Sequence, residues 1–193
     1  KMYKASLAVD SKYCVMADND NFYSVEGLRK SIEFLEFNSD YSACQGETIG
    51  FRLVGNRYYY SKNVWVSRPL PQYTLNDPSA LNRLQTISSK NFATFYCVNK
   101  VEELQETLSA LIKCNPNSLY IAEVLSHFYL IIHGKIKHLD LPYMYRQYDV
   151  SDSLNTLHAI NGNYQEQLLW GDLRNDIRNL VDNVADKIVE KEY

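Results

Sequence analysis

The chain has 193 residues, of which 46% are hydrophobic and 22% are charged, and its net charge is −3. This length and composition predict one well-buried α/β domain with a short appendage. The negative net charge excludes broad nucleic-acid binding, which needs a basic surface. No apolar run reaches the roughly 18 residues that span a bilayer. No signal peptide opens the sequence, so we expect a cytoplasmic protein without a transmembrane segment.

The four cysteines are scattered and lack the close pairs of a zinc site. Three of them lie in apolar stretches, which is typical of reduced, buried cysteines inside cells. We therefore expect neither disulfides nor a cysteine metal site. The residues are Cys14, Cys44, Cys97 and Cys114.

Strand and helix patterns alternate in the first half of the chain. The end of a helix is expected over residues 2–9, followed by a strand over 12–17. Ser24 is a predicted N-cap. Its helix has apolar residues at helical spacing, and a second strand is expected over 41–45. The predicted buried face of the helix consists of Val25, Leu28, Ile32 and Leu35.

A hairpin is expected after the second strand. Residues 51–54 and 57–60 flank Gly55-Asn56, a typical two-residue hairpin turn. A further short strand is predicted over 64–66. We interpret residues from about 47 to 78 as a β-hairpin insertion in the α/β layer.

The second half continues the alternation. Helices are expected over 79–89, from Val101 through Leu111 with a stop at Asn115-Pro116-Asn117, and over 118–133 with a stop at Gly134. A strand is expected over 92–98, extended chain over 136–145, and helix over 163–190.

A pair of carboxylates follows the first predicted strand, in the run Asp18-Asn19-Asp20. In α/β proteins, ligands bind beyond the carboxyl ends of strands. Two carboxylates at one turn can share a divalent cation, and that cation can hold a phosphate. The alternative is an Asx-type turn that caps the following helix.

A calcium loop is excluded by the residues that follow the acids. Its sixth position would be Tyr23, where a glycine turn is needed, and its twelfth would be Arg29 instead of an acid. The preceding segment is also a predicted strand and not a helix.

A phosphatase of the haloacid dehalogenase type is a second interpretation. In that family the first Asp after a strand is the nucleophile, and residues 171–176 resemble its second acidic motif. Phe22 departs from the family pattern, however, and the late acidic segment lies in a helical pattern. The alternative without a catalytic role is that Asp172 and Asp176 lie on a solvated helix face.

The strongest resemblance is to bacterial GT-A fold glycosyltransferases, in particular a group related to the large inverting family of polysaccharide synthases. It rests on residues 17–22, the helix through Leu28 and Ile32, and residues 40–46, followed by 133–137 and 143–147. It covers most of residues 5–148. The resemblance implies a Rossmann-like GT-A fold in residues 1–148, and we assign 149–193 to a C-terminal helical extension.

The resemblance implies transfer of a sugar from a nucleoside-diphosphate sugar, most simply a UDP-sugar, to a glycan, lipid-linked or protein acceptor. The reaction would invert the anomeric centre and use Mn²⁺ or Mg²⁺. Asp20 and Asp18 would be the metal ligands, with Asn19 between them and Asp18 also near the ribose. Arg146 would lie near the diphosphate. No transmembrane segment is expected, and peripheral membrane association is compatible with a lipid-linked acceptor.

Glu123 is the predicted general base, because residues 117–123 match the helix start that carries the acid in this family. The alternative is an exposed acid that the helix dipole favours. His127 and His133 lie on the same apolar helix and are expected to pack or cap.

Only 17 residues precede Asp18, whereas the resembled enzymes place two βα units before this motif. We therefore expect part of the donor pocket to be missing and this chain to bind a sugar nucleotide weakly. A noncatalytic module that binds carbohydrate or a protein partner is the third interpretation.

Overall fold

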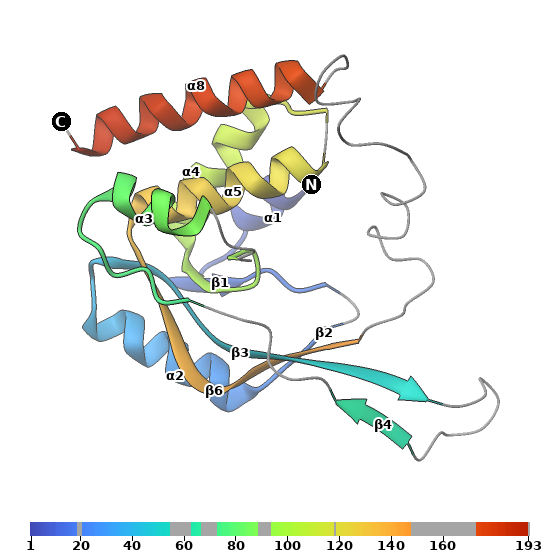
Figure 1. The fold of residues 1–193 in the computed structure, drawn as a ribbon. Helices are drawn as coiled ribbons and strands as arrows, with labels where there is room; N and C mark the ends of the chain where they lie inside the picture. Colours follow the sequence, from blue (N-terminus) through green and yellow to red (C-terminus); the bar gives the residue numbers. More distant parts are fainter. Residues whose placement is uncertain are drawn as a thin grey trace.

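The computed structural model describes residues 1–18, 21–54, 63–66, 73–88, 94–117, 119–147 and 173–192. These residues form a mixed α/β fold, which confirms the predicted class (Figure 1). The helices are α1 (Met2–Ser6), α2 (Val25–Phe37), α3 (Ala80–Ser88), α4 (Val101–Cys114), α5 (Leu119–His133) and α8 (Leu173–Glu192). The strands are β1 (Tyr13–Val15), β2 (Asn21–Tyr23), β3 (Tyr41–Val54), β4 (Asn63–Val66), β5 (Val98–Lys100) and β6 (Lys135–Gln147).

The strands form one sheet in the order β1-β5-β3-β6-β2, and β4 pairs with the distal part of β3. Strand β5 is antiparallel to both β1 and β3, while β6 is parallel to β3 and antiparallel to β2. Strands β1, β3 and β6 therefore all run in the same direction. Their carboxyl ends point toward one edge of the sheet.

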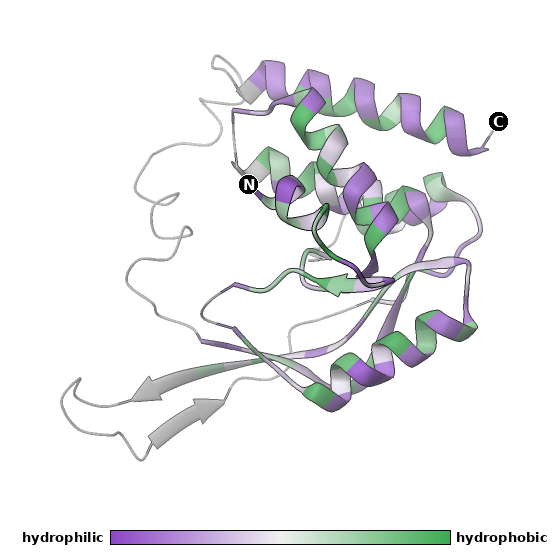
Figure 2. Ribbon diagram, turned by 180° about the vertical axis from the view of Figure 1, so that it is seen from behind, coloured by the Kyte–Doolittle hydropathy of each residue, from purple (hydrophilic) through white to green (hydrophobic). Residues whose placement is uncertain are grey.

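Helices cover both faces of this sheet (Figure 1). Helix α2 lies on one face, where Leu35 packs with Tyr143 and Met144 of β6. On the other face, Leu130 and Ile132 of α5 pack with α3 and the sheet. Helix α8 forms the outside of this layer and is largely hydrophilic (Figure 2).

Helix α2 begins where the sequence predicts, because the Ser24 side chain accepts a hydrogen bond from the Gly27 amide at 3.2 Å. Its predicted buried face is partly wrong. Val25 is 82% exposed and Ile32 is 37% exposed. The helix instead packs through Gly27, since a Cβ at that position would lie 2.7 Å from the Pro142 carbonyl oxygen. This close approach to β6 sets the helix rotation, and its buried residues are Gly27, Ser31 and Leu35.

Strand β3 is longer than predicted and its hairpin differs from the predicted one. Residues Glu47 to Phe51 pair with β6, so they belong to the main sheet. Residues Phe51 to Val54 then pair with Asn63–Val66 and not with 57–60. The two-residue turn at Gly55-Asn56 is therefore wrong, because Val54 is opposite Asn63. Residues 55–62 lie outside the described part of the chain.

The predicted strand over 92–98 is also wrong for the residues described. Residues 94–97 form a turn in which the Cys97 amide donates to the Thr94 carbonyl oxygen at 3.1 Å, and β5 begins only at Val98. The helices predicted from long periodic patterns are confirmed as α3, α4 and α5. Asn115 ends α4 in the left-handed conformation, with φ of 44°.

All four cysteines are free; Cys44 and Cys97 are buried, whereas Cys14 and Cys114 are partly exposed. No helix in the described residues is both long and apolar enough to cross a membrane. Helix α8 coincides with the later part of the predicted C-terminal helix. Residues 163–172 of that predicted helix lie outside the described residues.

Candidate functional site

The candidate site lies at the edge of the sheet where the parallel strands end. Asp18 follows β1, and Arg146 is near the end of β6. The antiparallel strands β2 and β5 begin at this same edge, so the residues before them also meet there. Strand polarity thus gathers several loops that are far apart in the sequence, as expected for ligand sites in α/β sheets.

Asp18, Tyr96 and Arg146 form a contiguous group that we call the Asp18 cluster. The Tyr96 hydroxyl donates a short hydrogen bond to Oδ2 of Asp18. The Arg146 guanidinium carbon lies 5.7 Å from the centre of the Tyr96 ring, within the range of a cation–π contact. Tyr96 is 8% exposed, whereas the Asp18 carboxylate is exposed to solvent.

Backbone pairing fixes the members of the Asp18 cluster. Strand β2 places Asn21 opposite Arg146, so the loop after Asp18 ends beside this arginine. The Tyr143 hydroxyl donates to the Tyr96 carbonyl oxygen at 2.6 Å and holds the turn before β5. Tyr23 donates to the Met16 carbonyl oxygen at 3.1 Å and ties β2 to the end of β1.

The pKa of Tyr96 responds to the charged groups around it, Glu123 among them. Burial is the main cause that raises the pKa of Tyr96, and its hydrogen bond to Asp18 adds to the increase. The negative charges of Asp18 and Glu123 repel the phenolate form of Tyr96 and raise its pKa further, whereas the positive charge of Arg146 lowers this pKa. Tyr96 therefore stays a neutral hydrogen-bond donor at neutral pH.

Glu123 projects from α5 beside a buried histidine. Its Oε1 lies 3.6 Å from Nε2 of His127, and the Glu123 side chain is 51% exposed. On the other side of the imidazole, Nδ1 of His127 accepts the Thr94 backbone N–H at 3.0 Å. His127 is thus buried as predicted, but it faces Glu123 and the turn that carries Tyr96.

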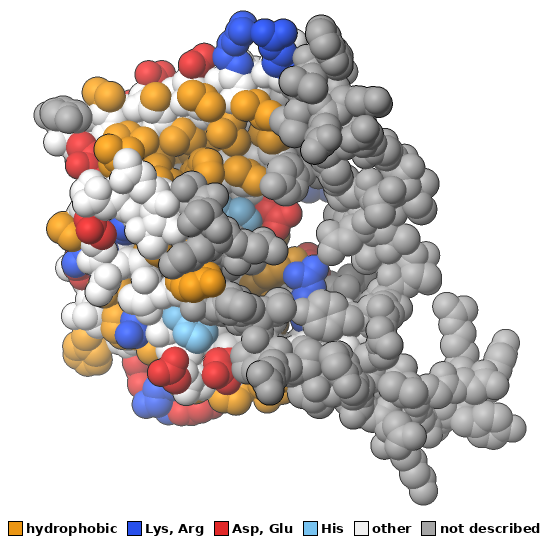
Figure 3. All heavy atoms as spheres, viewed as in Figure 1, with side chains coloured by type: hydrophobic (Ala, Val, Ile, Leu, Met, Phe, Trp, Pro, Cys, Tyr) orange, Lys and Arg blue, Asp and Glu red, His pale blue; other side chains and the backbone are white. Residues whose placement is uncertain are grey.

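A pocket of about 270 Å³ lies between α1 and β1 and extends to Asp18. Its lining is mostly apolar and includes Met2, Val9, Val15, Phe95, Leu104 and Leu108. On the face shown in Figure 3, acidic, basic and histidine side chains lie near one another at the border of the described residues. The Asp18 carboxylate therefore has open space beside it.

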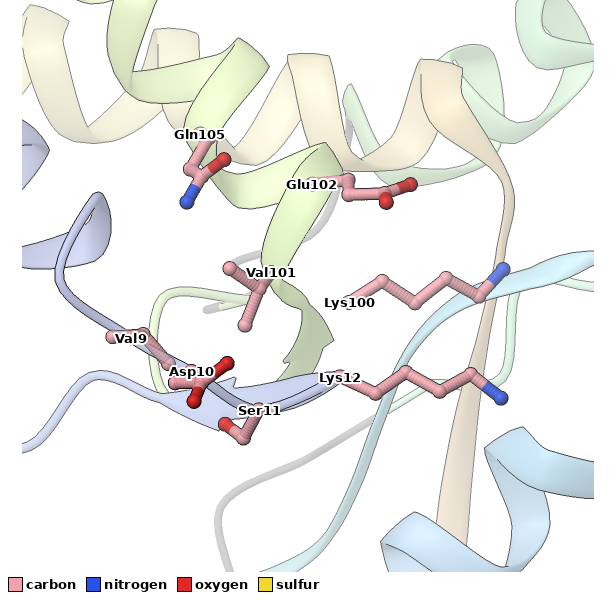
Figure 4. A pocket seen from close by; sticks show the side chains of 8 residues that line it. All are labelled: Val9, Asp10, Ser11, Lys12, Lys100, Val101, Glu102 and Gln105. Carbon is pink, nitrogen blue, oxygen red and sulfur yellow. The ribbon is translucent and has the colours of Figure 1, made fainter.

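A larger open pocket, of about 620 Å³, lies near the start of α4 and is lined by none of the predicted site residues (Figure 4). Its two lysines are already paired. Lys12 contacts Glu36 at 2.8 Å, and Lys100 donates to the Ser39 carbonyl oxygen at 2.8 Å and to Glu103 at 3.3 Å. Asp10 and Glu102 also line this pocket, so its charge is mixed.

Of the predicted site residues, the structure brings Asp18 and Arg146 together around Tyr96, while Glu123 lies on α5 beside His127 and acts on Tyr96 electrostatically. Asn19 and Asp20 lie outside the described residues. Asp18 does not provide the side-chain cap of α2, since Ser24 does so. Among the residues that the structure describes, no group of three or more His, Cys, Asp or Glu side chains could hold a metal ion.

Asp176 is 3% exposed and accepts a hydrogen bond from Asn117 at 3.3 Å, so its placement on a solvated face is wrong. It lies at the interface between α8 and the connection from α4 to α5. Tyr96 is the site residue that sequence reasoning missed, because it lies in an apolar run that resembles a strand.

A scan of the chain against protein-family models found no family that matches it. A search of curated proteins also found no matching protein.

Proposed function

We propose that this chain is a GT-A-type glycosyltransferase, or a part of one, that transfers a sugar from a UDP-sugar to a glycan or lipid-linked acceptor in the cytoplasm. The observation that carries the proposal is the convergence of Asp18, Tyr96 and Arg146, with Glu123 in electrostatic reach. An exposed carboxylate and a cation at one sheet edge, with a half-exposed second carboxylate on α5, suit a phosphorylated sugar.

The oxygen donors of this motif fit Mn²⁺ or Mg²⁺. Both ions favour carboxylate oxygens and share their coordination with phosphates and water. The exposed Asp18 carboxylate would provide one ligand, and Asp20 would provide the other. A divalent cation bound there would neutralise charge on the nucleoside diphosphate that leaves.

The remaining residues would act directly on the substrates. The Arg146 guanidinium would bind a phosphate oxygen, since its planar fork suits phosphate. Tyr96 would orient the Asp18 carboxylate through their hydrogen bond. Glu123 would accept the proton of the acceptor hydroxyl as that oxygen attacks the anomeric carbon, which inverts the configuration.

The first test is ligand-dependent stabilisation by UDP and Mn²⁺. A ligand present at 100 times its dissociation constant adds about 2.7 kcal/mol to the free energy of unfolding. We expect millimolar UDP with Mn²⁺ to raise the melting temperature, and Asp18→Asn or Asp20→Ala to abolish the increase. Asp140→Asn is the matched control, because the Asp140 side chain is fully exposed beside His138. An equal increase in all variants would contradict the proposed site.

A tyrosine pair tests the Asp18 cluster itself. Tyr96→Phe removes the hydroxyl that orients Asp18, so we expect UDP–Mn²⁺ affinity to fall roughly fivefold, the equivalent of one hydrogen bond of about 1 kcal/mol. Tyr41→Phe is the control, since Tyr41 begins β3 at the opposite edge of the sheet and its ring packs on Phe34. Titration calorimetry of both variants measures the difference. Equal UDP–Mn²⁺ affinities of the two variants would mean that the Tyr96 hydroxyl does not contribute to the site.

The other interpretations make different predictions. A phosphatase would release phosphate with Mg²⁺ and lose this activity in Asp18→Asn. Its second acidic motif is weakened here, because Asp176 is buried against Asn117. A noncatalytic module would bind glycan without metal and tolerate both Asp18→Asn and Asp20→Ala.

A further inference from the structure

His127 forms the centre of a chain of polar contacts that links the turn before β5 to Glu123. Its Nδ1 lies 3.0 Å from the Thr94 backbone nitrogen and 2.6 Å from Thr94 Oγ1. Its Nε2 lies 3.6 Å from Oε1 of Glu123. Both ring nitrogens of this histidine are therefore directed at polar neighbours.

The backbone contact selects one tautomer of the neutral imidazole. A peptide N–H can only donate, so Nδ1 of His127 must be the acceptor and carry no proton. The single proton of the neutral ring is then on Nε2, on the side of Glu123. Because His127 is 8% exposed, its ring is held in this orientation by the surrounding protein.

The Glu123 side chain is 51% exposed, and its Oε1 lies 3.6 Å from Nε2 of His127, slightly beyond hydrogen-bond length. Catalytic hydrogen bonds are often long before substrate binds. Glu123 and Asp18 both act electrostatically on Tyr96 in the turn before β5, and Arg146 of β6 opposes them.

We propose that His127 is a positioning residue, whose Nε2–H holds the Glu123 carboxylate toward the Asp18 cluster while Thr94 fixes the tautomer. The kinetic part of this inference rests on the proposed transferase function, in which Glu123 is the base. The geometric part does not. An ordinary glutamate–histidine pair one helical turn apart lies on the surface and leaves the tautomer free, whereas here the backbone of a separate segment selects it.

Two substitutions separate positioning from packing. His127→Asn keeps an acceptor at the place of Nδ1 for the Thr94 N–H and removes the donor to Glu123. His127→Gln keeps a donor near the place of Nε2 and removes the acceptor for Thr94. If His127 positions Glu123, we expect His127→Asn to lower kcat roughly 10- to 100-fold with KM for the donor sugar nucleotide unchanged. His127→Gln should retain more of kcat.

A purely structural role predicts the reverse order. His127→Asn would then keep wild-type kcat, and His127→Gln would be the poorer variant. Either of those results would overturn the proposal. His133→Gln is the control, because His133 is the other histidine of α5 near a glutamate, with Nε2 3.8 Å from Glu106. It should leave kcat and KM unchanged once the folded fraction is measured.

Nuclear magnetic resonance of the imidazole nitrogens tests the geometry without any activity. We expect the neutral His127 ring to show an unprotonated Nδ1 and a protonated Nε2. The Nε2–H signal should move upfield and exchange faster with water in Glu123→Ala, because its acceptor is gone. The opposite tautomer, or a signal that ignores Glu123→Ala, would overturn the proposal. If the wild-type protein transfers no sugar, the proposed function is refuted. The nitrogen signals of His127 would still test the contact between His127 and Glu123.

Discussion

At the scale of single residues, burial assigns different chemistry to the two histidines of α5. His127 has polar neighbours at both ring nitrogens. His133 instead packs near Tyr129, and burial lowers its pKa from 6.5 to about 4. The charge of Glu106 opposes this decrease, and the nearby lysines add to it. The prediction that His133 is a packing residue is confirmed.

This low pKa makes stability depend on pH. Below pH 6.5 the unfolded chain binds a proton at this histidine, whereas the folded protein does so only near pH 4. Stability from His133 is therefore complete above pH 6.5 and is lost as the pH falls toward 4, with a slope approaching about 1.4 kcal/mol per pH unit. Urea unfolding across this range should show a flatter profile for His133→Phe. Parallel profiles would mean that His133 titrates normally.

At the scale of elements, the carboxyl end of α5 is capped by an arginine from α3. Nε and Nη2 of Arg83 donate to the carbonyl oxygens of Ile131 and Ile132 at 2.9 and 3.2 Å. Its Nη1 donates to the carbonyl oxygens of Asp77 and Pro78. Arg83 is 3% exposed, so these carbonyl groups have little access to water. One buried cation thus joins α3, α5 and the loop before α3.

Arg83→Met tests this cap. The substitution keeps an apolar side chain but leaves buried carbonyl groups without a donor, so we expect a loss of about 2–4 kcal/mol in the free energy of unfolding. Arg29→Met is the matched control on α2, where the arginine side chain is 52% exposed and pairs with Glu26 and Glu33. The control should change stability by less than about 1 kcal/mol. Chemical denaturation compares the two, and similar losses would contradict the capping role.

At the scale of the whole molecule, α8 completes the hydrophobic core behind the sheet. Leu180 of α8 clusters with Ile121, Leu125 and Tyr129 of α5. Val184 and Ile188 of the same helix pack against the cluster that α3, α5 and the sheet form. Since α5 also carries Glu123 and His127, this packing supports the helix on which half of the candidate site lies.

Neighbouring residues of α8 give a sharp test of this packing. Leu180 is 8% exposed and Val181 is 54% exposed. Leu180→Ala should lower the free energy of unfolding by about 2–4 kcal/mol, because it leaves a cavity beside α5. Val181→Ala should change it by about 0.5 kcal/mol or less. Thermal and urea unfolding of both variants measure these changes in the free energy of unfolding. A small effect of Leu180→Ala would mean that α8 is not part of the cooperative core.

Local sequence patterns predicted the elements whose structure depends mainly on local interactions. The periodic residues Val101, Leu104 and Leu108 are buried along α4, and Ser24 caps α2 as expected. The pattern failed where a distant segment sets the structure. Gly27 fixes the rotation of α2 against β6, and the turn at 94–97 depends on contacts from Tyr143 and His127.

By itself, the sequence determined the α/β class, the main helices, and the position of Asp18 after a strand. Only the tertiary structure decided which side chains meet Asp18. The parallel direction of β1 and β6, and the pairing of Asn21 with Arg146, bring distant residues to one edge of the sheet. Tyr96 and His127 join them through contacts between segments far apart in the chain. Local periodicity reports which residues are buried, whereas strand order and register fix which buried residues become neighbours.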